Sequence, residues 1–349
     1  MDTVRPLRLA IAGAGLIGRA HAQRIALLHG CDLAAIADPS PAAAALASEH
    51  GVPLHADLAA LLAAEKPDGV ILATPNALHV PGALLCLEAG VPVLVEKPVA
   101  DTVDEAQRLV EAAARTQVPV LVGHHRRHSA ILERAVETVQ SGVLGRIVSV
   151  NASATFVKPD QYFVDGPWRT QPGGGPILIN LVHEIDNLRA LVGDIVEVQA
   201  FASRAIRGFP VEDTVAINLR FANGALGTFI LSDCAASPRS WEQTSGENKS
   251  YDHHGDEDCY VIAGTNGSLE VPTMRLRHYA GERSWWAPLT TKTLPLPDVD
   301  PLANQLAHFC QVIRGEVTPR VTAADARKTL QVTLAVAEAA RTERAVVVR

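Results

Sequence analysis

Cysteine is scarce in the sequence, and the cysteines that are present form no paired motif. They are scattered over the chain: Cys31, Cys86, Cys234, Cys259 and Cys310. In a long chain, an odd number of scattered cysteines is typical of reduced and mostly buried thiols. The sequence therefore predicts neither a disulfide framework nor a cysteine-based metal site.

Long apolar runs and an excess of positive charge are also lacking. No stretch approaches the roughly 20 apolar residues that cross a bilayer, and the Met1 region lacks the basic segment and apolar run of a secretory signal. The formal net charge of −7 argues against a nucleic-acid-binding surface. We therefore expect a cytoplasmic protein that binds neither membranes nor nucleic acids.

The first 120 residues alternate between apolar strands and helical patterns. The expected strands are 7–12, 33–37, 52–54, 69–73, 91–96 and 118–122, and the expected helices are 16–28, 41–50, 57–65, 79–89 and 102–116. Strands separated by helices of this length indicate βαβ units and a parallel sheet. With right-handed crossovers, this gives a doubly wound α/β fold.

The pattern changes after about residue 123, where most strands follow one another without helices between them. The expected strands are 146–156, 197–205, 213–221, 225–234, 260–263, 268–271 and 274–279, and the expected helices are 128–141, 177–191, 304–314 and 323–341. Consecutive strands suggest an antiparallel sheet, and Asn223-Gly224 is a hairpin signal. Residues 238–258 read as a long polar loop. We therefore expect two domains, residues 1–122 and residues 123–349, with the boundary between residues 122 and 123.

A glycine motif follows the first expected strand and opens the first expected helix. From Gly13 the segment reads Gly-Ala-Gly-Leu-Ile-Gly, which is the G-x-G-x-x-G pattern in the context that it requires. Gly13 permits a tight turn, Gly15 lets a pyrophosphate approach the backbone, and Gly18 permits close helix packing. Leu16 and Ile17 form the helix N-terminus that faces the phosphates. The motif predicts a dinucleotide cofactor.

Asp38 ends the second expected strand, twenty positions after Gly18. An acid there accepts hydrogen bonds from the ribose 2′-hydroxyl and would repel the additional phosphate of NADP. No arginine lies directly beside it in the sequence, so we expect NAD rather than NADP. The alternative is that Asp38 only caps the helix that begins near Pro41.

Lys97 stands at the end of an expected buried strand, within Glu96-Lys97-Pro98. Open α/β sheets bind ligands beyond the carboxyl ends of their strands, where an amine can meet both nicotinamide and substrate. Oxidation of a secondary alcohol needs a base, and desolvation or nearby cations can lower a lysine pKa from about 10.4 to about 7–8. The alternative is a surface lysine at a strand end.

A second polar cluster lies on the helix expected after the triple glycine. Asn180, His183 and Asp186 are spaced three residues apart and share one helix face. A histidine facing a cleft can shuttle a proton or orient a substrate hydroxyl, although a lone histidine is more often a core residue. His183 has no second His or Cys at zinc-ligand spacing, so we expect no metal.

Together these motifs resemble the Gfo/Idh/MocA oxidoreductases, from Leu7 to about Val348. The segments that carry the resemblance are Gly13–Gly18, Asp38, Ala73–Asn76 with His79, Glu96–Pro98, Val122–Arg127 and Gly173–Asp186. The Thr-Pro-Asn-x-x-His and Glu-Lys-Pro pair is much more specific than the glycine motif alone. The family implies an N-terminal Rossmann domain and a C-terminal α/β domain with a large, open, mostly antiparallel sheet for substrate binding and oligomerisation.

The resemblance also implies residue roles. Lys97 resembles the family's catalytic lysine, and His183 resembles the histidine of its inositol dehydrogenase-like members. Residues implied to line the cofactor are Thr74, Pro75, Asn76, His79, Glu96, Lys97, Trp168 and Arg169. Inositol dehydrogenase-like members carry Asp four residues before the histidine, where this chain has Ile179. The adjacent Asn180 cannot be a carboxylate base, which leaves more of the proton transfer to Lys97 and His183.

Arginine and aromatic residues give clues to the substrate. Arg126, Arg127 and Arg169 could each hold a carboxylate bidentately, with solvation or a cofactor phosphate as the alternative. The aromatic residues of loop 238–258 and the adjacent Trp285 and Trp286 suit a sugar, an inositol or a hydroxylated ring acid.

We therefore predict an NAD-dependent dehydrogenase that oxidises a secondary alcohol on a cyclic polyol, sugar or hydroxylated ring acid. The predicted catalytic residues are Lys97 and His183, and the predicted substrate-binding residues are Arg127, Arg169, Asn180 and His183. The expected assembly is a homodimer or homotetramer. Three alternatives stay open: a dehydrogenase of a carboxylated cis-dihydrodiol, a non-catalytic NAD-binding regulator, and a glycosidase with tightly held NAD.

Overall fold

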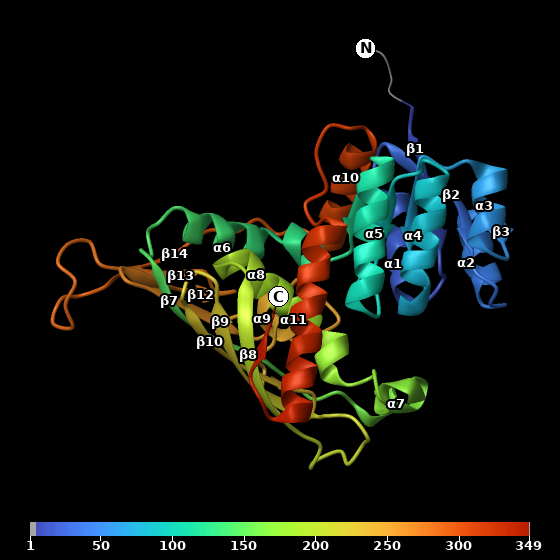
Figure 1. Ribbon diagram of the computed structural model, residues 1–349. Coiled ribbons are helices and arrows are strands. Elements are labelled where there is room, and N and C mark those ends of the chain that lie inside the picture. Colours follow the sequence, from blue (N-terminus) through green and yellow to red (C-terminus); the bar gives the residue numbers. More distant parts are fainter. Residues whose placement is uncertain (1–4, 349) are drawn as a thin grey trace. The chain divides into compact units, whose positions relative to one another are not determined.

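The computed structural model describes residues 5–348, and these form two compact units (Figure 1). The first unit contains the chain up to His128 together with Asp300–Leu330. The second contains Ser129–Val299 together with the chain from Gln331 onward. Each unit has its own sheet and hydrophobic core. The Met1 region, for which the sequence predicts no secretory signal, lies outside the described residues.

The first unit is built on a six-stranded parallel sheet in the order β3-β2-β1-β4-β5-β6. Its strands are β1 (Leu7–Ala12), β2 (Cys31–Ala37), β3 (Leu54–His55), β4 (Gly69–Leu72), β5 (Val93–Val95) and β6 (Val120–Val122). Its helices are α1 (Leu16–Leu27), α2 (Ala43–His50), α3 (Leu58–Glu65), α4 (His79–Glu88), α5 (Val103–Thr116) and α10 (Pro301–Ile313). This strand order is that of a doubly wound dinucleotide-binding sheet, which confirms the predicted fold class.

The grouping of α10 with the first unit differs from the expected division at residue 122. Leu306 and Phe309 of α10 belong to the same buried cluster as Leu9 of β1 and Ile25 of α1. Gly69 leaves room for this contact, because a Cβ at that position would lie 3.2 Å from the Phe309 ring. The apolar face of α10 therefore completes the first core, although the helix is separated from it by more than 170 residues of chain.

The second unit is built on a nine-stranded sheet in the order β14-β13-β12-β11-β7-β10-β9-β8-β15. Its strands are β7 (Ile147–Thr155), β8 (Ile195–Ser203), β9 (Thr214–Phe221), β10 (Leu226–Ser232), β11 (Tyr260–Gly264), β12 (Gly267–Val271), β13 (Arg275–His278), β14 (Thr290–Thr293) and β15 (Val346–Val347). Neighbouring strands of this described sheet run antiparallel except β7 and β10, which pair in parallel. The sheet is therefore mixed, with the predicted hairpin turn at Gly224 joining β9 to β10.

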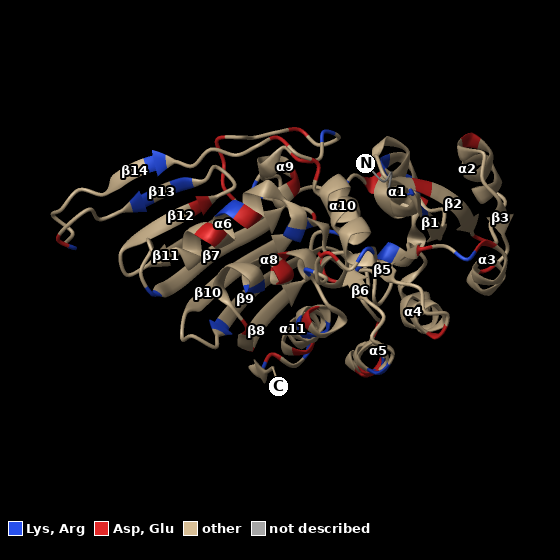
Figure 2. Cartoon of the chain, turned by 90° about the horizontal axis from the view of Figure 1, so that it is seen from above, with Lys and Arg blue, Asp and Glu red and all other residues tan. Residues whose placement is uncertain are grey.

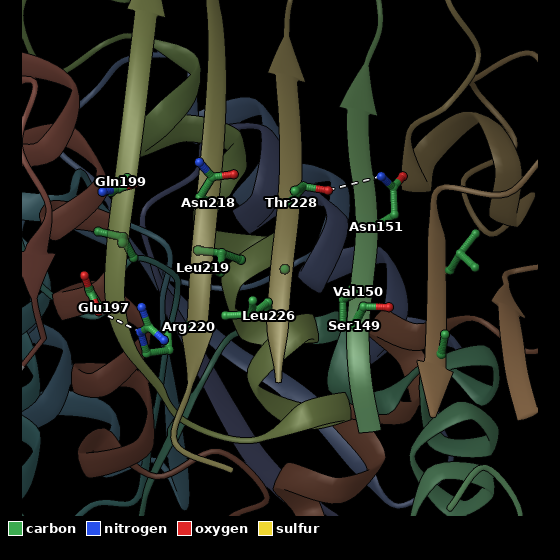
Figure 3. Close-up of a pocket in the computed structure, with 14 residues that line it drawn as sticks. Ser149, Val150, Asn151, Glu197, Gln199, Asn218, Leu219, Arg220, Leu226 and Thr228 are labelled. Atoms are coloured by element: carbon green, nitrogen blue, oxygen red, sulfur yellow. Dashed lines mark hydrogen bonds and ion pairs between the residues drawn. The ribbon is translucent and has the colours of Figure 1, made fainter. Parts of the chain in front are cut away.

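One face of this sheet is covered by helices, and their apolar residues share its core. The covering helices are α6 (Ala130–Gln140), α8 (Val182–Val192) and the part of α11 (Ala323–Thr342) from Gln331 onward. The other face is open, with polar side chains in rows across neighbouring strands (Figure 3). One row runs from Gln199 through Asn218 and Thr228 to Asn151, where the Asn151 amide donates to Thr228 at 3.1 Å. Charged residues of both signs are spread over both units (Figure 2).

Side-chain caps fix several helix starts. Asp57, Thr102 and Ser129 accept backbone N–H groups at the N-termini of α3, α5 and α6. Asp300 does the same for α10, whose first residue is Pro301. Such caps satisfy N–H groups that have no partner inside the helix. Helices α3, α5 and α6 begin one or two residues after the expected positions, whereas α10 begins three residues before its expected start at residue 304.

The expected polar loop 238–258 contains the short helix α9 (Trp241–Ser245). Trp241 is only 3% exposed and packs against Tyr260 in the core, so the interpretation that it presents an aromatic face to a substrate is wrong. Trp285, by contrast, is 86% exposed between β13 and β14. Within residues 5–348, no helix has the length and apolar character needed to cross a membrane. The cytoplasmic location stays a prediction.

Candidate active site

The glycine turn between β1 and α1 is closed at its two ends and open in the middle. Gly13 has a φ of +98°, and a Cβ there would overlap the carbonyl oxygen of Ala73. A Cβ at Gly18 would overlap the carbonyl oxygen of Gly13. A Cβ at Gly15 would meet no atom within 4 Å. The open space at Gly15 adjoins the N-terminus of α1, where backbone N–H groups can bind a phosphate.

The two residues after Gly15 form the first turn of α1. Leu16 is 92% exposed and Ile17 is half-buried, so their side chains leave this helix end accessible. No acidic residue lies in the first turn. An anion at the helix N-terminus would therefore meet the favourable field of the helix dipole without an opposing charge from the first turn itself.

Both carboxylate oxygens of Asp38 accept backbone N–H groups, and one of them ties Asp38 to the glycine turn. One accepts the Ala14 N–H at 2.7 Å, and the other accepts the Ser40 N–H at 2.7 Å. Partial burial would raise the pKa of Asp38, but these hydrogen bonds outweigh it and hold the pKa below its ordinary value. The carboxylate is ionised and keeps lone pairs for hydroxyl donors. Helix α2 has Ala42 as its N-cap, so the alternative in which Asp38 caps this helix is wrong.

His79 connects two loops at the carboxyl edge of the sheet. It is buried at the start of α4, with Nδ1 at 2.7 Å from the Pro98 carbonyl oxygen and Nε2 at 2.9 Å from the Thr74 carbonyl oxygen. This ring therefore joins the loop after β4 to the loop after β5. Pro75 and Asn76 are exposed beside it, while the buried Thr74 hydroxyl has no hydrogen-bond partner among the described residues.

Glu96 is a buried acid directly before Lys97. One of its oxygens lies 2.8 Å from His21 Nε2, and the other accepts the Lys97 backbone N–H at 3.2 Å. Burial would raise the pKa of Glu96, but the hydrogen bond to His21 and the charges of His21, His125 and Lys97 lower it further, so the pKa lies below its ordinary value. Lys97 itself is half-buried and lies two residues after the end of β5. Glu96 thus fixes the backbone that carries the lysine.

These residues fit a bound dinucleotide. The open space at Gly15 suits a pyrophosphate, the ionised Asp38 suits ribose hydroxyls, and the unpaired Thr74 hydroxyl suits a polar group of the nicotinamide end. Within residues 5–348, no group of three His, Cys, Asp or Glu side chains has the arrangement of a metal site.

Arg127 is already engaged in the first unit. Its guanidinium donates to Asp325 at 2.6 Å, and its carbonyl oxygen accepts a hydrogen bond from Arg320 at 2.8 Å. Arg126 is buried, with 3% exposure. A guanidinium held by an aspartate is a weaker candidate for a substrate carboxylate than an uncommitted one. The role of Arg127 in substrate binding stays a prediction.

In the second unit, the triple glycine packs against two neighbouring segments. A Cβ at Gly174 would overlap the Trp168 carbonyl oxygen, and a Cβ at Gly175 would overlap the carboxylate of Glu212. Glu212 in turn accepts the Ile177 N–H at 2.9 Å. The small residues thus bring the segment of Trp168 and the Glu212 side chain against the start of the following helix.

This helix begins with a π-helical turn, Ile177–Leu181, and continues as α8. Asn180 is half-buried within the turn, and His183 lies in the first turn of α8 with 9% exposure. A π turn changes which residues share a helix face and is frequent at functional sites. The next residue, Glu184, is buried and accepts a hydrogen bond from Tyr260. His183 therefore stands on a helix that is firmly held to the sheet.

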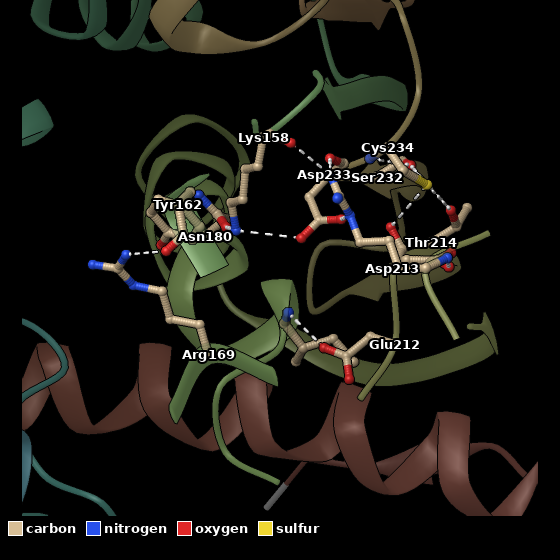
Figure 4. A network of polar contacts seen from close by, with 12 residues as sticks. Lys158, Tyr162, Arg169, Asn180, Glu212, Asp213, Thr214, Ser232, Asp233 and Cys234 are labelled. Atoms are coloured by element: carbon tan, nitrogen blue, oxygen red, sulfur yellow. Dashed lines mark hydrogen bonds and ion pairs between the residues drawn. The ribbon is translucent and has the colours of Figure 1, made fainter. Parts of the chain in front are cut away.

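Lys158 was not predicted from the sequence, yet it lies at the centre of a polar network (Figure 4). It follows β7 and is only 9% exposed. Its ammonium donates to Asn180 Oδ1 at 2.8 Å and lies 3.5 Å from Asp233 Oδ2. A sequence signal exists, because Lys158-Pro159 follows a strand just as Lys97-Pro98 does.

The surroundings of Lys158 lower its pKa to about 8. Burial is the main cause, and the charges of Arg207 and Arg169 add to it, while Asp233 acts in the opposite direction. The nitrogen also lies 5.0 Å from the centre of the Tyr162 ring. Arg169 stacks on the same ring at 3.8 Å and donates to the Tyr162 carbonyl oxygen at 2.5 Å. Trp168, its neighbour, is 58% exposed.

Comparison with known families gives two matches. The family described as an oxidoreductase family with an NAD-binding Rossmann fold matches residues 7–124. The family described as the GFO/IDH/MocA C-terminal domain matches residues 132–270. The two matched segments fall within the first and the second compact unit, respectively.

Two relatives and one crystal structure show what this chain is similar to. The rhizopine catabolism protein MocA of Rhizobium meliloti is 26% identical over 337 residues, 95% of this chain and 94% of the relative. Inositol 2-dehydrogenase 4 of Saccharopolyspora erythraea is 32% identical over 231 residues, 64% of this chain and 66% of the relative. The crystal structure of the WlbA dehydrogenase from Bordetella pertussis with NADH and UDP-GlcNAcA has a TM-score of 0.81 at 23% identity and covers 99% of both chains. That likeness shows the fold.

Proposed function

This chain belongs to the GFO/IDH/MocA family of NAD-binding oxidoreductases, and from this premise we propose which reaction it performs. It is an oxidoreductase of sugars or polyols. The proposed reaction oxidises a secondary alcohol on a cyclic polyol, a sugar or a hydroxylated ring acid. Lys97 is the proposed acid/base, and His183 is the second catalytic residue.

The observation that carries the proposal is the position of Lys97. It lies two residues after the end of β5, at the carboxyl edge of the parallel sheet, where the glycine turn follows β1 and Asp38 follows β2. Ligands of doubly wound sheets bind beyond this edge. The Glu96 carboxylate holds the Lys97 backbone N–H, which supports a fixed position for the amine.

The proposed chemistry removes a hydride from carbon and a proton from oxygen, so that the alcohol becomes a ketone. NAD, when bound, supplies the acceptor for the hydride. The neutral Lys97 amine takes the hydroxyl proton and becomes an ammonium, which can return the proton in the reverse reaction. His183 is proposed to orient a hydroxyl group, Asn180 to contact the substrate, and Arg127 and Arg169 to bind anionic groups.

Two further features are part of the proposal. The ionised Asp38 favours NAD over NADP, because a 2′-phosphate would meet an uncompensated carboxylate. The open sheet face of the second unit supports a homodimer or homotetramer. Large apolar side chains are exposed along strands β7 to β11 of that sheet: Val148, Phe201, Leu226, Ile230 and Val261. Exposed apolar side chains that lie together commonly mark interaction surfaces.

Substitution of Lys97 tests the catalytic role. We expect Lys97→Ala to retain less than a tenth of wild-type turnover and to bind NADH nearly as well, because the glycine turn and Asp38 are unchanged. Turnover is measured as NADH formation over a panel of polyols, sugars and dihydrodiols, and binding as NADH fluorescence. Lys292→Ala, at an exposed position on β14, is the matched control.

Retention of more than a tenth of the activity by Lys97→Ala would contradict the assignment of the base. If the wild-type protein bound NADH but formed no NADH from NAD with any compound of the panel, the alternative of a non-catalytic regulator would be favoured. Activity confined to carboxylated dihydrodiols would select the ring-acid alternative.

A further inference from the structure

We propose that Lys158 and Asn180 form a binding subsite for a carboxylate group of the substrate. The substrate class that follows is a carboxylated sugar or carboxylated cyclic polyol. This inference rests on the proposed function, because it assigns the carboxylate to the alcohol that the enzyme oxidises.

The first argument is the hydrogen-bond inventory of the two side chains. The Lys158 ammonium has three N–H donors, of which one binds Asn180 Oδ1 at 2.8 Å and one points to Asp233 at 3.5 Å. The third has no partner among the described residues. Because Asn180 uses its oxygen as acceptor to the lysine, its amide nitrogen is what it presents to a ligand. The pair therefore offers donors only, which suits a group that only accepts hydrogen bonds.

The second argument is the balance of charge. Asp233 is buried and already binds Arg207 Nε at 2.8 Å, a shorter contact than its 3.5 Å approach to Lys158. The charged groups that act on Lys158 are the carboxylates of Asp233 and Glu212 and the guanidinium groups of Arg207 and Arg169. Arg207 pairs with Asp233 and Asp160, whereas Arg169 forms no ion pair among the described residues. Because a partly buried cation is costly without a partner, Arg169 beside Lys158 indicates an anionic ligand.

The third argument concerns the walls of the subsite. Tyr162 and Phe156 place their rings 5.0 and 5.7 Å from the Lys158 nitrogen. Arg169 stacks on Tyr162, and its buried Nε has no hydrogen-bond partner within residues 5–348. Aromatic walls with a few convergent polar donors are typical of small-molecule sites.

The experiment compares matched acid and neutral sugars with the full-length protein and NAD. The pairs are D-glucuronate with D-glucose and D-galacturonate with D-galactose, assayed for NADH formation and, separately, for binding by calorimetry. We expect kcat/KM or affinity for the acid to exceed that for its neutral partner about 10-fold or more, the range of a hydrogen bond to a charged group. Equal or better use of both neutral sugars would overturn the subsite.

Two substitutions locate the preference. Asn180→Asp keeps the shape of the side chain but replaces the donor with a second carboxylate, so the acid-to-neutral ratio should fall about 10-fold. Lys158→Met removes the charge at similar length and should lower the same ratio. Lys292→Met, on exposed β14, removes one charge elsewhere in the same unit and should leave the ratio unchanged. A ratio that stays at the wild-type value in Asn180→Asp would contradict the proposal.

The two hypotheses fail in different ways. If no sugar yields NADH, the proposed dehydrogenase function is in question, and calorimetric preference for the acids still decides the subsite. If the sugars are oxidised without preference for the acids, the dehydrogenase stands and the carboxylate subsite is wrong. If Lys158→Met does not fold, the acid-to-neutral ratios of the wild-type protein and of Asn180→Asp still test the subsite.

Discussion

The glycine turn of the first unit is a candidate site formed by backbone, whereas the Lys158 network of the second unit is a candidate site formed by side chains. The turn uses backbone, and its important feature is the space around Gly15. The network uses side chains from separate parts of the chain: Lys158, Tyr162, Arg169, Asn180, Arg207 and Asp233. A backbone site is sensitive to any added atom, whereas a side-chain site is sensitive to charge and to donor or acceptor type. Substitutions in both regions test this difference.

The largest effect is expected from Gly18→Ala. The new Cβ would overlap the Gly13 carbonyl oxygen, which is backbone and cannot move aside as a side chain would. We expect a net loss of about 2 kcal/mol in the free energy of unfolding, because overpacking outweighs the gain in helix propensity. Chemical denaturation followed by circular dichroism measures it. A loss below about 0.5 kcal/mol would mean that the turn is not rigid.

The matched substitution Gly15→Ala should act on binding and not on stability. Its Cβ meets no atom within 4 Å, and the φ of −70° at Gly15 is accessible to alanine. We expect a change in unfolding free energy within about 0.5 kcal/mol. The affinity for NADH should fall about 10-fold, because the methyl group occupies the approach of the pyrophosphate. Fluorescence titration measures the affinity, and unchanged NADH binding would contradict the position assigned to the phosphates.

The smallest effect is expected from Glu212→Gln in the second unit. Burial raises the pKa of Glu212, so the folded state binds its proton more tightly than the unfolded state does. Stability due to this group therefore falls as pH rises from the ordinary carboxyl pKa through the raised value. The amide keeps an acceptor for the Ile177 N–H and carries no charge. We expect Glu212→Gln to be as stable as wild type or up to about 1 kcal/mol more stable at neutral pH.

The control for this substitution is Glu212→Ala, which removes the acceptor and leaves the Ile177 N–H unpaired. It should lose about 1–3 kcal/mol. Thermal unfolding of both variants from pH 4 to pH 8 separates the contribution of charge from that of the hydrogen bond. Equal destabilisation by both substitutions would show that the charge itself is required.

The difference between the backbone turn and the side-chain network also explains which features of the fold and of the site could be predicted from the sequence. Strand β1 spans the expected residues 7–12, and the glycine turn was recognised, because buried parallel strands and backbone motifs depend on local sequence. The parallel pairing of β7 with β10 joins strands that are more than 60 residues apart, and local patterns do not encode it. Lys158 was missed for the same reason, since its partner Asn180 is 22 residues away. The π turn that carries Asn180 has no distinct pattern of its own.

The packing of α10 has a consequence for how the chain is made. Phe309 and Leu306 supply apolar side chains to a core that otherwise comes from residues near the N-terminus, including Leu9 and Ile25. During synthesis, the sheet of the first unit emerges early but lacks this cover until almost the whole protein has left the ribosome. A fragment that ends at His128 would leave that apolar surface bare and prone to association. The core of the nucleotide-binding half is thus completed late, when the second unit lacks only its final helix and strand.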